Sequence, residues 1–148
     1  GAMSPDEVRA HMESADVFLF TSDFNEGWGA VLNESMNSGC AVVASHAIGS
    51  VPFLIKDGVN GLVYENGNQR HFERQVCRLL DDTAYRRRIG ENAYFTIVNT
   101  WNAQVAAGRF VELAKSLMQG KEDDHLFDDG PCSKAEILSN GWYYANES

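Results

Sequence analysis

Three short apolar segments give the chain the pattern of an α/β protein. Residues 16–20, 41–44 and 61–64 read DVFLF, AVVA and GLVY. Continuous apolar runs of this length are typical of strands that are buried on both faces of a parallel sheet. A helical stretch of about ten residues from Gly29 separates the first two runs, and Pro52 can open a short helix before the third. The order strand, helix, strand, helix, strand predicts right-handed crossovers in a short parallel sheet of about three strands.

Helical patterns precede and follow these strands. Ser4 is followed by Pro5 at the first helical position and by Glu7 three residues after the cap, which is typical of a helix start. Apolar side chains recur at helical spacing in three later segments, 68–82, 85–97 and 106–117. We expect these three amphipathic helices to cover the sheet, which makes the fold class a partial Rossmann-like α/β domain.

We expect one compact unit over residues 4–119. The length of 148 residues suits one domain with a real core. Residues 1–3 look like a scar left by tag cleavage. Helical periodicity ends near Gly120, so residues 120–148 are expected to form an acidic linker and a tail of unknown role, with room for one short helix.

Composition narrows the class of partner and the compartment. The net charge of −9 and the pI near 4.8 exclude a basic stripe for nucleic acid. The three cysteines form no close pair and no apolar run is long enough to span a bilayer, which predicts a cytoplasmic protein. Histidine and cysteine spacings fit no metal site, so neither metal nor cofactor is expected. The arginines at 86–88 are interpreted as a solvated helix face, and the second interpretation is peripheral contact with an acidic membrane.

The candidate chemistry lies in the stretch EGWGAVLNE, residues 26–34. The loop that begins at Ser22 follows the first strand, and parallel sheets place ligands at the carboxyl ends of their strands. Gly27 and Gly29 let the backbone approach a ligand, and the next helix offers unpaired amides that suit a phosphate. The candidate donors are the amides of Trp28, Gly29, Ala30 and Val31. Glu26 and Glu34 border that pocket, and a carboxylate can accept both hydroxyls of a vicinal diol, which indicates a nucleotide sugar as ligand.

These residues resemble a known family. Glu26 and Glu34, with seven residues between them, occur with NSGCAVVAS, GSVPFLIKDGVNGLVY and NTW in the order of the carboxyl-terminal domain of GT-B retaining glycosyltransferases, family 4 or group 1. The resemblance covers residues 4–119, and the family that it points to includes enzymes of bacterial polysaccharide biosynthesis. It implies that Glu26 contacts the donor sugar at the catalytic centre, that Glu34 binds the ribose, and that the amides between them hold the diphosphate.

The resemblance implies a hexosyltransferase that moves a sugar from a nucleotide diphosphate donor to a glycan or lipid-linked acceptor with retention and without an obligatory metal. The family's amino-terminal acceptor domain is missing, so we expect the isolated fragment to be inactive. Phe53 stands where the family commonly has a glutamate, and no role is assigned to it. The strand at 16–20 is expected to expose an edge, which either associates with a second copy or is covered by the tail GWYYANES.

Several alternatives stay open at this point. The fragment is alternatively a non-catalytic module that binds a nucleotide or a protein, or a nucleotide-sugar epimerase of the same architecture. A glycosidase also uses two carboxylates, but it needs no glycine-opened phosphate site. Trp28 is either a core residue or a pocket wall, and His46 either lines the sugar pocket or lies in a surface loop. Cys40 is expected to be a small buried hydrophobic residue.

Overall fold

The computed structural model describes residues 2–121 and 126–144. Within these ranges the three predicted strands form, each within one residue of its expected ends. The elements are α1 (Pro5–Ser14), β1 (Val17–Phe20), α2 (Val31–Asn37), β2 (Ala41–Ser45), α3 (Val51–Leu54), β3 (Leu62–Tyr64), α4 (Gln69–Asp81), α5 (Thr83–Asn99) and α6 (Ala103–Met118). The helix after Gly29 is shorter than expected, since α2 has seven residues.

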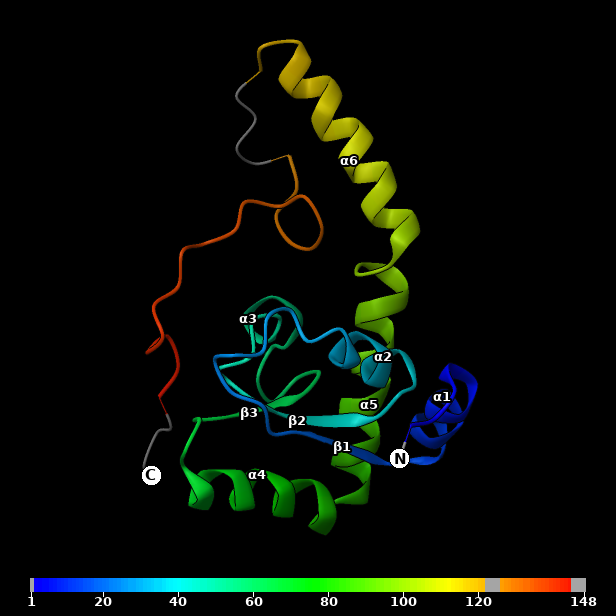
Figure 1. Cartoon of the computed structure of the whole chain (residues 1–148), viewed down its shortest axis with the longest axis vertical. Coiled ribbons are helices and arrows are strands. Elements are labelled where there is room, and N and C mark those ends of the chain that lie inside the picture. Colours follow the sequence, from blue (N-terminus) through cyan, green and yellow to red (C-terminus); the bar gives the residue numbers. More distant parts are fainter. Residues whose placement is uncertain (1, 122–125, 145–148) are drawn as a thin grey trace.

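The sheet is parallel, with the order β1-β2-β3. Its register pairs Val17 with Ala41 and Val43 with Leu62. Figure 1 shows α4 on one side of the sheet and α2 and α3 on the other. The predicted α/β fold with a short parallel sheet flanked by helices is confirmed.

The residues of β2 divide the core into two layers because successive side chains point to opposite faces. Val42 and Ala44 belong to the cluster that includes residues of α2 and α3 and the later part of α5. Ala41 and Val43 belong to the second cluster, which α4 and the first half of α5 complete. Every residue of β2 is buried, as expected of a central parallel strand.

The helix starts follow local capping chemistry. The Ser4 amide donates to Glu7 Oε2 at 2.7 Å, and the Glu7 amide donates to Ser4 Oγ at 3.3 Å, so the predicted start of α1 is confirmed as a capping box. The carboxylate–amide bond lowers the pKa of Glu7. The helices α4, α5 and α6 are capped at their starts by side chains that the sequence analysis did not predict as caps: Asn68, Asp82 and Asn102.

The expectation that three helices cover the sheet is wrong for the third. Helix α6 has no buried residue, and its apolar residues Phe110 and Leu117 are 65% and 59% exposed. Figure 1 shows α6 extending away from the sheet. An amphipathic stripe predicts an apolar partner but does not say where that partner lies. No helix within residues 2–121 and 126–144 is both long and apolar enough to cross a membrane.

The arginine run is only partly a solvated face. Arg86 has an 18% exposed side chain and donates to the Leu79 carbonyl at 2.9 Å, which joins α5 to the end of α4. Arg88 lies over the Tyr85 ring. Arg87 and Arg88 are both exposed, as expected of a solvated face, and the Arg87 side chain is 82% exposed. Arg86 is therefore the position of the run that serves helix packing.

Within the described residues, the tail does not cover the β1 edge. Leu19 of β1 is 45% exposed, and the described part of the tail, Gly141–Tyr144, instead lies against β3, where the Tyr143 hydroxyl contacts the Val63 carbonyl. No helix forms within residues 126–144, where the sequence left room for one short helix. The remaining tail residues 145–148 and linker residues 122–125 lie outside the described residues. Pairing of the β1 edge with a second copy stays a prediction.

Candidate functional site

The candidate loop follows β1, and a local hydrogen bond holds its acid in place. The Glu26 amide donates to the Asp23 carbonyl at 3.0 Å, which closes a turn. The Ser22 hydroxyl donates to Glu26 Oε2 at 3.4 Å, and both side chains are half-buried. Ser22 and Glu26, which the sequence placed in one site, are therefore in contact.

Gly27 and Gly29 lie in this loop, and Gly49, which the sequence did not indicate, approaches it from the loop after β2. Gly29 has φ +73°, and a Cβ added there would lie 2.9 Å from the Phe20 ring, so only glycine fits. Gly27 has open space around its Cα, but its carbonyl accepts from the Gly49 amide at 3.0 Å. A Cβ on Gly49 would lie 2.3 Å from that carbonyl. The close approach thus joins the loop after β1 to the loop after β2.

Helix α2 begins directly after this turn. Its first backbone bonds run from the Leu32 amide to the Gly29 carbonyl at 2.9 Å and from the Glu34 amide to the Ala30 carbonyl at 3.2 Å. Within the described part of the chain, no backbone acceptor is found for the four candidate amides, those of Trp28, Gly29, Ala30 and Val31. These donors are available to a ligand at the carboxyl end of β1.

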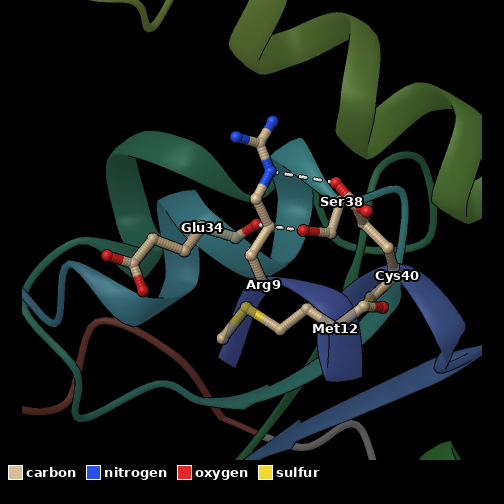
Figure 2. Close-up of polar contacts among 6 residues, drawn as sticks. Arg9, Met12, Glu34, Ser38 and Cys40 are labelled. Atoms are coloured by element: carbon tan, nitrogen blue, oxygen red, sulfur yellow. Dashed lines mark hydrogen bonds and ion pairs between the residues drawn. The ribbon is translucent and has the colours of Figure 1, made fainter. Parts of the chain in front are cut away.

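Glu34 lies on another side of α2, in a groove of ≈ 430 Å³ between α1 and α2. Val8, Met12 and Ser38 also line this groove. Figure 2 shows the Glu34 carboxylate pointing away from the guanidinium of Arg9, which pairs with Glu13 at 2.9 Å. Within residues 2–121 and 126–144, no partner is found for the Glu34 carboxylate. It can therefore accept hydrogen bonds from a ligand.

Trp28 is neither fully a core residue nor a free surface side chain. It is 43% exposed, and its indole nitrogen donates to Asn33 Oδ1 at 2.9 Å. Its ring stacks on Phe53 with a centroid distance of 6.0 Å and an angle of 18°, and it tilts against Trp101 at 5.7 Å. Phe53 thus packs on a residue of the candidate loop, which the sequence did not indicate.

Cys40 is fully buried, as expected of a small hydrophobic residue. Its thiol donates to the Met12 carbonyl at 3.2 Å, which ties the start of β2 to the end of α1 (Figure 2). Burial, followed by the charge of Asp16, raises the pKa of this thiol. The raised pKa disfavours a thiolate nucleophile at this position.

His46 is 6% exposed, so it does not lie in a surface loop. Its Nδ1 accepts from the Asn66 amide at 2.8 Å, which puts the ring proton on Nε2, and Nε2 lies 3.1 Å from the Asn140 carbonyl. The ring also meets Phe24 of the candidate loop edge to face, with centroids 5.6 Å apart. His46 therefore links that loop to the carboxyl-terminal tail.

The tail contributes contacts that sequence reasoning missed. The Trp142 indole nitrogen donates to the His46 carbonyl at 3.1 Å. The Tyr143 hydroxyl lies 3.1 Å from Asp57 Oδ2 and 3.0 Å from the Val63 carbonyl, so two acceptors share its proton. Burial and then the charge of Asp57 raise the pKa of Tyr143 well above its usual range. Only the aromatic composition of the tail hinted at such docking.

The geometry defines a parallel α/β domain with its candidate site at the carboxyl ends of the strands, and solved structures show the same architecture. The C-terminal domain of the group 1 glycosyl transferase LpcC from Francisella tularensis superposes with a TM-score of 0.60 at 28% identity, covering 66% of this chain and 50% of that chain. Anabaena HepE in complex with UDP superposes with a TM-score of 0.63 at 26% identity, covering 72% of this chain and 29% of that one. The fold is that of a GT-B glycosyltransferase carboxyl-terminal domain.

Residues 1–95 match the family described as glycosyl transferases group 1, and the chain belongs to this family. A lipopolysaccharide core biosynthesis glycosyltransferase, LpsE from Rhizobium meliloti, is 29% identical over 111 residues, which cover 75% of this chain and 32% of that protein. The chain thus spans about a third of that relative's length. The group 1 resemblance seen in the sequence is confirmed.

Proposed function

We propose that this chain is the donor-binding part of a retaining family 4 glycosyltransferase that transfers a hexose from a nucleotide diphosphate sugar to a glycan or lipid-linked acceptor. The family match over residues 1–95 carries the proposal, because it includes the whole candidate loop and α2. The Anabaena relative was solved with UDP and with UDP-glucose, which supports a nucleotide sugar as donor here. Acceptor binding belongs to a part of the enzyme outside this chain.

The two acids have separate tasks in this proposal. Glu34 accepts the ribose hydroxyls in the α1–α2 groove, where Val8 and Met12 supply an apolar wall for the nucleoside. Glu26, positioned by Ser22, contacts the donor sugar. Their separation along the turn and first helical residues allows one extended ligand to meet both.

The reaction needs stabilisation of a departing diphosphate. The acceptor oxygen forms a bond to the anomeric carbon while the bond from that carbon to the phosphate oxygen breaks, and the leaving phosphate takes the acceptor's proton. The amides of residues 28–31 face the charge that develops on the phosphate. Removal of one such preorganised donor typically costs about 3 kcal/mol in the barrier.

Direct binding tests the division of roles. UDP, GDP and ADP, and their glucose or mannose conjugates, are titrated calorimetrically into the wild-type chain and three charge-matched variants. Glu34→Gln should weaken the free nucleotide about tenfold, because a charge-assisted hydrogen bond is lost. Glu26→Gln should spare the free nucleotide and weaken the nucleotide sugar.

Glu91→Gln, on the exposed face of α5, is the control and should change neither affinity. Equal losses of free-nucleotide affinity in the Glu26 and Glu34 variants would contradict the division of roles. Absence of binding for every nucleotide and conjugate would refute the proposed function of this chain. Incubation with labelled donors and sugar acceptors should give no product, because the acceptor part is needed for transfer.

A further inference from the structure

Residues 140–143, named here the strap, contact His46, which follows β2, and Val63 of β3. The Asn140 carbonyl accepts a hydrogen bond from Nε2 of His46, and the Trp142 indole nitrogen donates to the His46 carbonyl. Tyr143 bonds to Val63 at the free edge of β3 and stacks on His71, with centroids 6.1 Å apart and an angle of 8°. Trp142 and Tyr143 also pack against the larger core cluster. The strap therefore occupies a specific site.

The chain that leads to the strap is anchored before it and then exposed. Arg109 of α6 donates to the carbonyls of Asp129 and Pro131 and lies over the Phe127 ring at 4.8 Å. Residues 132–139, between that anchor and the strap, form no helix or strand, and Ile137 among them is fully exposed. Figure 1 shows residues 126–144, coloured orange to red, running from beside α6 toward the sheet.

The strap meets the candidate site through His46. Phe24 of the candidate loop contacts the His46 ring, which also stacks on Tyr143 at 6.0 Å. Three residues after His46, the Gly49 amide bonds to Gly27, next to Glu26. A donor sugar that reaches Glu26 therefore approaches the loop on which the strap rests. The ribose groove at Glu34 lies between α1 and α2, away from these contacts.

The strap is suited to reversible docking. Its two aromatic side chains are half-buried, whereas His46 and Val63, to which they bond, are buried. The hydrogen bonds that Trp142 and Tyr143 make to backbone carbonyls can be replaced by water or by sugar hydroxyls after release. The exposed connection limits the entropy cost of closing, because one end is already held on α6.

We propose that the strap is an autoinhibitory segment that competes with the sugar of the donor for the loop at His46. This inference rests on the proposed function, since it adds a regulatory contact to the same site. A strap that is closed in about nine of ten molecules raises the apparent Kd for the donor about tenfold. Free nucleotide, bound at the α1–α2 groove, should be affected less.

The experiment compares the wild-type chain with Trp142→Ala, Tyr143→Phe and the matched control Tyr144→Phe, whose side chain is exposed. UDP-glucose and GDP-mannose, with UDP and GDP, are titrated calorimetrically. Trp142→Ala should lower the Kd for the bound nucleotide sugar about tenfold. Tyr143→Phe should lower it less, and Tyr144→Phe should leave it unchanged.

A second readout separates this inference from the proposed function. The indole N–H resonance of Trp142, assigned from its loss in Trp142→Ala, should shift when the nucleotide sugar saturates the wild-type chain. Binding with an unchanged resonance, or equal or weaker affinity in Trp142→Ala, would overturn the strap and leave the donor site in place. Failure of every variant to bind any of the four ligands would overturn both.

Discussion

Gly49→Ala tests whether the loops after β1 and β2 are held together as the structure shows. A Cβ at this position would lie 2.3 Å from the Gly27 carbonyl oxygen, roughly an ångström short of an ordinary carbon–oxygen contact. The loops must separate, which also breaks the bond from the Gly49 amide to Gly27. Overpacking costs about 1–3 kcal/mol and the lost bond about 1 kcal/mol more, so the free energy of unfolding should fall by about 2–4 kcal/mol.

The assay is urea unfolding of the two alanine variants Gly49→Ala and Gly108→Ala beside the wild-type chain. Gly108 is in α6 and a Cβ there meets nothing within 4 Å, so the same chemical change should stabilise by about 0.5–1 kcal/mol. For a chain of this size, the loss in Gly49→Ala corresponds to a fall in Tm on the order of 5–10 °C. A Gly49 variant as stable as the wild type, beside a Gly108 variant that behaves as expected, would refute the contact between the loops.

Two further outcomes are expected. Burial, then the charge of Arg74, lowers the pKa of His71 below 6.5. The folded state therefore binds fewer protons than the unfolded state. The free energy of unfolding that His71 contributes above pH 6.5 should be lost as the pH falls through the folded-state pKa. In urea unfolding, His71→Gln should reduce the pH dependence of the free energy of unfolding, and the exposed variant His11→Gln should leave it unchanged. Equal pH profiles for the wild type and His71→Gln would contradict this. Leu19→Lys should weaken any self-association through the β1 edge in sedimentation, and a wild-type chain that stays monomeric at high concentration would refute association by that edge.

The sequence predicts the sheet well because the relevant information is local. Strand β2 is a continuous apolar run, and a segment with that pattern is stable only when both faces are covered. The start of α1 is equally local, since Ser4 and Glu7 contact each other across one turn. The candidate loop was also located correctly after β1, although the need for glycine at position 49 depends on a contact with position 27 that no local pattern records.

The misses share a physical origin in long-range contacts. The apolar residues of α6 recur at helical spacing, but this periodicity defines an apolar stripe without identifying the surface that the stripe contacts. His46 is a lone histidine in the sequence, and its burial depends on Asn66 and on Asn140 from the far end of the chain. Such polar contacts are specific only after the fold has brought the segments together.

The position of the tail changes how the free edges of the sheet should be understood. The sequence predicts that β1 is the edge strand that another segment covers, because β1 is strongly apolar. The structure covers β3 instead, where Asp57 accepts from the Val63 amide at 2.8 Å and Tyr143 donates to the Val63 carbonyl. Side chains thus satisfy both backbone groups of Val63, and this edge offers them to no further strand. Residues 141–144 do not cover the β1 edge, so any pairing with a further strand is expected at β1 and not at β3.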